Sequence, residues 1–144
     1  MNELKQPEYF INRELSLLEF NRRVLAQARD ERVPFLERLL YLCISSSNLD
    51  EFFEVRVAGI KQQIDFDTPA TGADNMTPTE VMEQISSTAH EIVTEQYRIL
   101  NEIILPQFKQ IGVTFTRRES WNDEQAQWVK KYFEDQLLPV LSPL

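Results

Sequence analysis

A run of polar side chains lies between two apolar stretches near the middle of the chain: Ser45, Ser46, Ser47 and Asn48, with acidic residues directly behind them. Serine and asparagine side chains form hydrogen bonds with nearby backbone groups and are therefore common where helices end and begin. On this interpretation Ser47 or Asn48 caps the following helix. The alternative is that the break holds a ligand, since a carboxamide both donates and accepts hydrogen bonds.

The acidic residues behind this run are Asp50, Glu51 and Glu54. Carboxylates are the ligands that magnesium prefers. Consecutive helical residues point in different directions, however, and acidic residues are common at the positive end of a helix. The sequence therefore predicts no metal site here.

Arg56 and Gly59 are two further unusual residues in the same predicted helix. No acidic residue lies three or four positions from Arg56, so we expect its charge to meet a tertiary partner or a ligand. Glycine inside a helix costs about 1 kcal/mol and often permits the close approach of another group. We therefore expect something to pack against Gly59.

His90 and Cys43 are the only histidine and the only cysteine in the chain. A di-iron bundle needs a Glu-x-x-His pair, but Ser87 stands three residues before His90, so that hypothesis fails. We expect His90 to be a solvated helix residue. Cys43 lies in an apolar helical pattern and is predicted to be a core residue, because a buried free cysteine behaves as a small hydrophobic side chain.

Composition limits the class of protein. The 144 residues suit one domain, or one domain and part of a second, and their formal charge of -8 would repel a nucleic acid. Trp121 and Trp128 are predicted to be packing residues, since no basic groove accompanies them. No long apolar run and no charged leader followed by an apolar segment is present, which favours a soluble, cytoplasmic protein.

Apolar residues recur at helical spacing through the first 106 residues, which indicates an antiparallel helical bundle with one long helix. The first helix, 14–29, is expected to bury Leu17, Phe20, Val24 and Ala28. The second begins at Pro34, is expected to bury Phe35, Leu36, Leu39, Leu40 and Cys43, and ends at the serines. The third begins near Leu49, buries Leu49, Phe53, Ile60 and Ile64, and is followed by a loop at 65–75.

The long helix has a strong start signal at Thr77-Pro78-Thr79-Glu80, which combines a capping threonine, a proline at the first helical position and a glutamate three residues after the cap. It is expected to end near Pro106. Its predicted inner face consists of Val81, Ile85, Ala89, Ile92, Ile99 and Ile103.

Residues 107–144 differ in character from the bundle. The segment 113–116 is β-branched and aromatic and predicts a strand, after which Asn122 is expected to cap a helix. The last eight residues of the sequence are the apolar segment LLPVLSPL. We therefore expect a helical domain at 1–106, followed at 107–144 by the first strand and helix of a truncated α/β domain.

Three segments together carry a family resemblance: YFINRELSLLEFNRRVLAQA, PFLERLLYLCISSSNLDEFFEVRVAGIKQQ and the LLPVLSPL ending. They resemble the amino-terminal part of the histidine-phosphorylating bacterial polyphosphate kinases. The motifs NRELSxLxFNxRVL and SSNLDEFFxVRVAG are long and therefore specific. Leu17 departs from the pattern, because many members have tryptophan at its position.

The resemblance implies a helical amino-terminal domain, then an α/β head domain that dimerises, then two catalytic domains outside this sequence. The family enzyme reversibly transfers the terminal phosphate of ATP through a phosphohistidine to inorganic polyphosphate, with Mg²⁺. The resemblance thus implies no catalytic residue here, an inactive fragment, and ATP, ADP and polyphosphate as ligands of the whole enzyme. It also implies a homodimer or larger assembly and peripheral membrane association.

By the same resemblance, the asparagine of SNLDEFF contacts ATP, which corresponds to Asn48 here. Its carboxamide complements the donor and acceptor on an adenine edge. Ser47 and Arg56 are weaker candidates as neighbours. The alternative function is a non-catalytic helical scaffold or docking module.

Overall fold

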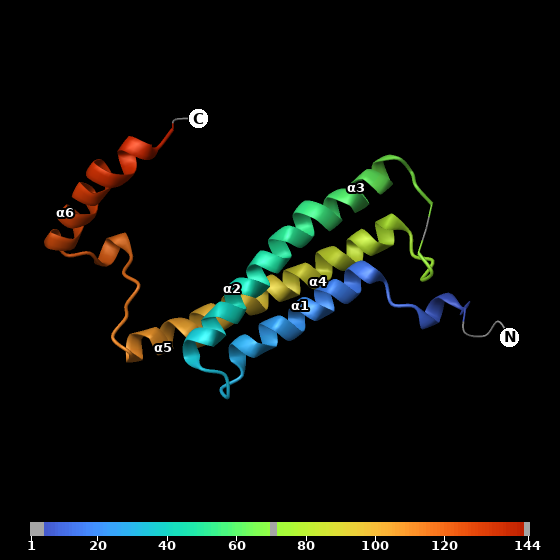
Figure 1. Cartoon of the computed structure of the whole chain (residues 1–144), viewed down its shortest axis with the longest axis horizontal. Helices are drawn as coiled ribbons and strands as arrows, with labels where there is room; N and C mark the ends of the chain where they lie inside the picture. The colour runs from blue at the N-terminus through green and yellow to red at the C-terminus, as the bar shows by residue number, and fades with distance from the viewer. Residues whose placement is uncertain (1–4, 70–71, 143–144) are drawn as a thin grey trace. The chain divides into compact units, whose positions relative to one another are not determined.

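The computed structural model describes residues 5–69 and 72–142, which divide into two compact units, residues 1–107 and 108–144. The first unit is a bundle of three helical rods (Figure 1). The helices are α1 (Arg13–Arg29), α2 (Phe35–Glu51), α3 (Ala58–Asp65), α4 (Pro78–Ile99) and α5 (Leu105–Gln110). Helix α1 runs antiparallel to the rod that starts with α2 and continues into α3. The rod that starts with α4 runs back antiparallel to α2. The predicted helical bundle is confirmed.

Helix α1 begins where predicted, but a different face of it is buried. The Asn12 side chain caps it by accepting hydrogen bonds from the backbone N–H groups of Glu14 and Leu15. The buried face consists of Leu18, Asn21, Leu25 and Ala28. Leu17 and Phe20, which the sequence places inside, are exposed. The pattern was misleading because the true face includes a polar residue, Asn21, which hydrophobic periodicity does not count.

Helix α2 continues through the four polar residues, so the predicted break at the serines is wrong. The helix ends only at Glu51, which puts Ser47 and Asn48 inside it rather than at a cap. Ser45 is fully buried, and its backbone carbonyl and hydroxyl both accept hydrogen bonds from other helices. These tertiary bonds outweigh the weak local preference of serine and asparagine for caps.

The expected third helix is a continuation of the second. A π-helical turn, Phe52–Val57, joins α2 to α3, and α3 ends at Asp65 before a loop that contains Pro69 and Gly72. Residues 70–71 of that loop lie outside the described part of the chain. Within the π turn the buried residues are Phe52 and Val57, so Phe53 is exposed although Leu49 and Ile60 on either side are buried as predicted. Ile64, in the last turn of α3, is also exposed.

The inner face of α2 also differs from the predicted one. Its buried residues are Arg38, Leu42, Ser45 and Leu49. Leu36, Leu40 and Cys43 are exposed, so the prediction that Cys43 is a core residue is wrong. An apolar pattern does not predict the buried Arg38. It is accommodated because its Nε donates a 3.0 Å hydrogen bond to the backbone carbonyl of Ala28.

Helix α4 follows the sequence prediction closely. The Thr77 hydroxyl accepts from the N–H of Glu80, and the Glu80 carboxylate accepts in return from the N–H of Thr77, which completes the predicted capping box. The predicted face is buried from Val81 through Ile99. A second π turn, Leu100–Ile104, then shifts the face, so that Ile104 is buried where Ile103 was expected.

Pro106 does not end the rod, because it lies at the second position of α5. The π turn Leu100–Ile104 directly precedes α5, so the local helical hydrogen bonding is already irregular where the proline N–H is missing. Among the described residues, no helix has both the length and the apolar character needed to cross a bilayer.

The second unit contains helix α6 (Asp123–Tyr132), which Asn122 caps as predicted through reciprocal hydrogen bonds with Gln125. The predicted strand at 113–116 is absent, since no strand occurs in the described residues. A strand needs a neighbour for its backbone hydrogen bonds, and this unit supplies none. Trp128 is exposed and stacks on Tyr132, with 5.3 Å between ring centroids, so it is not a core residue of this unit.

The LLPVLSPL segment extends to residues 143–144, which lie outside the described part of the chain. In the described part, Leu138 and Val140 form a short 3-10 turn and are both exposed. The assignment of 107–144 to a separate α/β head domain stays a prediction.

Two arginine–glutamate pairs join α1 to α4. Arg22 pairs with Glu91, and Arg29 Nη1 lies 3.3 Å from Glu95 Oε1. Glu95 also accepts two hydrogen bonds from Arg98, of 2.7 and 2.8 Å. These bonds from Arg98, and secondarily the charge of Arg29, hold the pKa of Glu95 below its ordinary value of 4.5.

A carboxyl group whose pKa is lower in the folded than in the unfolded protein stabilises the fold at pH values above its ordinary pKa. This stabilisation is lost as the pH falls through the pKa of the folded state. We expect Glu95→Gln to lower the melting temperature at pH 7, with a free-energy cost below about 1 kcal/mol because the pairs are partly solvated. The difference from the parent protein should shrink as the pH falls below about 4.5. Calorimetry between pH 3 and 7 measures it, with the exposed α4 variant Glu83→Gln as control. A difference that does not change with pH would contradict this assignment.

Candidate functional site

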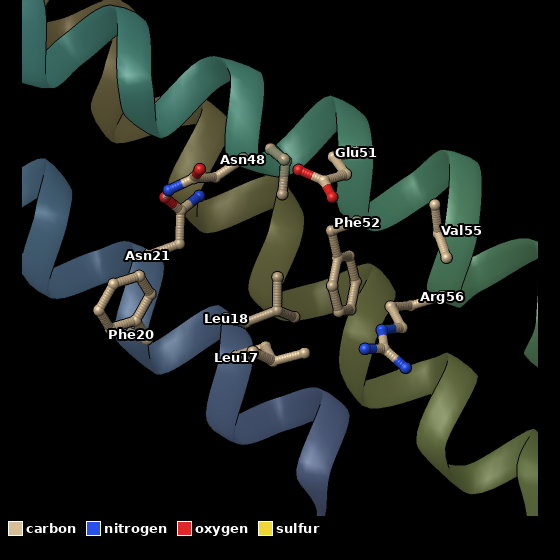
Figure 2. Close-up of a pocket in the computed structure, with 10 residues that line it drawn as sticks. Leu17, Leu18, Phe20, Asn21, Asn48, Glu51, Phe52, Val55 and Arg56 are labelled. Atoms are coloured by element: carbon tan, nitrogen blue, oxygen red, sulfur yellow. Dashed lines mark hydrogen bonds between the residues drawn. The ribbon is translucent and has the colours of Figure 1, made fainter.

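An open groove of about 240 Å³ runs between α1 and the rod formed by α2 and its π turn. Figure 2 shows its walls, with Leu17, Leu18, Phe20 and Asn21 from α1 facing Asn48, Glu51, Phe52, Val55 and Arg56. Leu49 completes the lining. Most of this surface is apolar; Asn21 and Asn48 lie at one end, Arg56 at the other, and the Glu51 carboxylate lies on the wall between them. The groove therefore has the composition typical of a small-molecule site.

The structure brings two of the three predicted site residues together. Asn48 and Arg56 both line the groove, on one side of the same rod. Ser47 is exposed and does not line it. The prediction of Ser47 as a neighbour in the site assumed a cap in which the chain turns.

Exposed apolar side chains of α1 form one wall of the groove. Leu17 and Phe20 are 38% and 51% exposed, and Val55 opposite them is 59% exposed. The sequence correctly marks Leu17 and Phe20 as part of an apolar stripe but places them in the core. They are exposed because α1 turns the face that contains Asn21 toward the core, which leaves these two side chains beside the groove.

Asn48 is the outer member of a chain of hydrogen bonds that crosses the bundle. Its Nδ2 donates to Oδ1 of Asn21 at 3.3 Å, and Nδ2 of Asn21 donates to the backbone carbonyl of Ser45 at 3.0 Å. Nε2 of Gln96 on α4 donates to Oγ of Ser45, also at 3.0 Å. Asn21, Ser45 and Gln96 are buried, so the polar groups of three helices satisfy one another inside the core. We call these four residues the polar chain.

Sequence reasoning missed Asn21, Ser45 and Gln96. A signal for Asn21 is present, because it lies three residues after Leu18 and four before Leu25, on one helical stripe. The same holds for Gln96 between Ile92 and Ile99. A polar residue inside an apolar stripe indicates a buried hydrogen bond, although the stripe alone does not tell which partner it has.

Arg56, which was expected to meet either a tertiary partner or a ligand, has an acidic residue nearby. Its Nε lies 4.0 Å from Oε2 of Glu14, which is at the start of α1. That separation is too long for a hydrogen bond, and Oε2 of Glu14 is buried without one. The Arg56 side chain is 41% exposed, so its donors remain accessible from the groove.

The remaining candidates lie apart from one another. Glu51 lines the groove, whereas Asp50 faces a different depression between α2 and α4. Within the described ranges, no cluster of three or more His, Cys, Asp or Glu side chains suits a metal ion. His90 is exposed on α4, as predicted, and its Nδ1 lies 2.6 Å from the backbone carbonyl of Ser86.

Gly59 lines a second open depression, of about 400 Å³, between the start of α1 and α3. A methyl group placed on Gly59 would meet no described atom within 4 Å. The expected close approach to Gly59 is therefore not made by the described residues of this chain.

Comparison with known proteins identifies the family of this fold. Residues 10–116 match the family model for the polyphosphate kinase N-terminal domain. The chain is 50% identical over 134 residues to a polyphosphate kinase of Burkholderia cenocepacia, which covers 93% of this chain and 20% of the relative. It is 49% identical over 135 residues to a polyphosphate kinase of Pseudomonas aeruginosa, covering 94% of this chain and 20% of that protein.

A solved structure gives the same result. The crystal structure of polyphosphate kinase from Porphyromonas gingivalis superimposes with a TM-score of 0.78 at 28% identity, over 94% of this chain and 19% of that one. The class of structure is therefore a helical amino-terminal domain, and the chain belongs to the polyphosphate kinase family as its N-terminal domain. It spans about a fifth of the length of the relatives it matches.

The open space beside Gly59 leads to a prediction about stability. Gly59→Ala adds a methyl group without a clash and restricts the unfolded chain, so it should stabilise the protein by about 0.5–1 kcal/mol. Urea unfolding followed by circular dichroism measures the change. Ala58→Gly, one position earlier on an exposed part of the same helix, is the matched control and should lower stability by a similar amount. A loss of stability in Gly59→Ala would show that another group packs against this glycine.

Proposed function

We propose that this domain forms part of an enzyme that reversibly transfers the terminal phosphate of ATP to inorganic polyphosphate through a phosphohistidine. In this proposal the groove between α1 and α2 contacts the adenine side of ATP, and Asn48 contacts the nucleotide directly. The observation that carries the proposal is that Asn48, the residue singled out by the SNLDEFF motif, lies at one end of an open apolar groove.

The chemistry of the groove supports a purine base. A planar base is apolar on its faces and has hydrogen-bonding groups only at its edge. Leu17, Phe52 and Val55 provide apolar contact surface, and Asn48 provides a carboxamide at the end of it. Arg56 at the other end is accessible and carries a charge that suits a phosphate group. Ser47 has no direct role in this proposal, since its side chain lies outside the groove.

Phosphoryl transfer itself is assigned to other parts of the enzyme. His90, the single histidine of the chain, is exposed on α4 and does not line the groove. We therefore propose that the phosphohistidine, the Mg²⁺ ligands and the polyphosphate channel lie in the remainder of the protein. A net charge of -8 supports this division, because a negatively charged domain repels polyphosphate.

Several properties of the whole enzyme extend the proposal. We expect a homodimer or larger assembly formed through the head domain, a cytoplasmic location and peripheral contact with the membrane. ATP and ADP are then the nucleotide substrates, and nucleic acid is not a partner.

The alternative function, a scaffold or docking module, has one observation in its favour. Leu36, Leu40 and Ile44 recur every four residues along α2, and all three are exposed. Such a row of apolar side chains is typical of a surface that contacts another domain. A docking role does not require Asn48, so the two functions are separable by experiment.

Asn48→Ala in the full-length enzyme should raise the KM for ATP about tenfold, the effect of losing one hydrogen bond to the substrate, with a smaller change in kcat. Steady-state kinetics with polyphosphate as acceptor measures both constants. Ser46→Ala is the matched control, because Ser46 is an exposed residue of the same helix that does not line this groove.

The melting temperature of each variant shows whether the fold is retained. An unchanged KM for ATP in a stably folded Asn48→Ala enzyme would exclude the nucleotide role and favour the docking module.

A further inference from the structure

A carboxamide that is free to rotate cannot by itself distinguish adenine from guanine. Adenine presents an amino donor at its 6 position, where guanine presents a carbonyl acceptor. A half-turn of an asparagine side chain exchanges its oxygen and its NH₂ group, so a free side chain adapts to either base. Selectivity by Asn48 therefore requires that something fixes which of its two groups faces the ligand.

The polar chain fixes the orientation of Asn21 first. Nδ2 of Asn21 lies 3.0 Å from the backbone carbonyl of Ser45. A carbonyl oxygen only accepts hydrogen bonds, so Asn21 must direct its NH₂ group toward Ser45 and its oxygen the other way. Asn21 is only 4% exposed, and water cannot readily replace either partner.

The orientation of Asn21 then fixes that of Asn48. Oδ1 of Asn21 accepts a hydrogen bond from Nδ2 of Asn48 at 3.3 Å, and Figure 2 shows the two carboxamides facing each other at one end of the groove. Rotation of Asn48 by a half-turn would bring two acceptor oxygens together. Such a rotation loses the hydrogen bond and leaves the buried oxygen of Asn21 unsatisfied, which is the costly outcome for a buried polar group.

The carboxamide oxygen of Asn48 is available to accept a hydrogen bond from a ligand. Its Oδ1 accepts no hydrogen bond from the residues that the structure describes, and it is not one of the unpaired atoms that are buried. This oxygen therefore has contact with solvent beside the groove. Nδ2 carries a second hydrogen, so the fixed side chain offers an acceptor and a donor, which complement the amino group and N7 of adenine, whereas guanine presents acceptors at both positions.

We infer that Asn21 is a positioning residue that makes the groove selective for a purine with a 6-amino group. Asn21 does not touch the nucleotide. It holds the Asn48 oxygen where it accepts from an amino group and meets the carbonyl of guanine with repulsion. The inference rests on the proposed nucleotide role of Asn48, and it adds the base specificity of that site and the residue that sets it.

The test compares kcat/KM for ATP and GTP in the full-length enzyme. Asn21→Leu removes the acceptor and keeps a similar volume, so Asn48 becomes free to turn. The ratio of kcat/KM for ATP to that for GTP should fall about tenfold, the equivalent of one hydrogen bond. Asn21→Asp keeps an acceptor toward Asn48 and should retain most of the preference, although it loses the donor toward Ser45 and some stability.

Gln96→Leu is the structural control. Gln96 donates to Ser45 from α4 and makes no hydrogen bond to Asn48, so this variant interrupts the polar chain on its far side. It should lower the melting temperature and leave the ATP to GTP ratio unchanged. A change of ratio in Gln96→Leu as large as in Asn21→Leu would show that loss of core packing, rather than the orientation of Asn48, controls the base preference.

A substrate test on the unmodified enzyme does not depend on any variant folding. Purine riboside triphosphate lacks the 6-amino group and should react with kcat/KM about tenfold below that of ATP. Equal values for the two substrates would overturn the inference.

The outcomes also separate the two proposals. If Asn48→Ala raises the KM for ATP and Asn21→Leu leaves the ratio intact, the nucleotide site stands and the positioning role of Asn21 is overturned. If Asn48→Ala has no effect on the KM for ATP, both fail.

Discussion

The bundle depends on a set of hydrogen bonds that bury polar groups of three helices together. A buried polar group without a partner costs about 1–3 kcal/mol, so Asn21, Ser45 and Gln96 are tolerated in the core only because they satisfy one another. This requirement fixes the rotation of α1, with Asn21 inward. It also keeps α2 helical through its serines. The groove follows from it, because the same rotation leaves Leu17 and Phe20 on the surface beside Asn48.

The parts of the fold that depend on local interactions were predictable from the sequence. The capping boxes at Thr77 and Asn122 consist of residues only three positions apart, and both are present. The inner face of α4 was also predictable as far as Ile99, because its stripe is almost entirely apolar. The continuity of α2 was not, because the bonds to Ser45 come from residues 24 and 51 positions away. The π turns, which change the buried face after Leu49 and Ile99, were not predicted, because hydrophobic periodicity assumes regular α-helical spacing.

The sequence singled out part of the candidate site, but the local structure that it predicted there was wrong. Asn48 and Arg56 were singled out, and both line the groove. Asn48 was expected at a helix start, however, and it lies inside α2 instead. The proposed contact with ATP thus depends on the Asn48 side chain and on Asn21. A family resemblance identifies the residue, whereas its orientation comes from a contact between two motifs, with Asn21 in NRELSxLxFNxRVL and Asn48 in SSNLDEFFxVRVAG.

We propose that an oriented Asn48 oxygen at the end of an apolar groove accepts a hydrogen bond from the base of ATP. The most direct test is a structure of the full-length enzyme with a non-hydrolysable ATP analogue. We predict the 6-amino group of adenine within about 3 Å of Asn48 Oδ1, with the bond from Asn48 to Asn21 retained. A groove filled by another segment of the enzyme, with the base bound elsewhere, would contradict the claim.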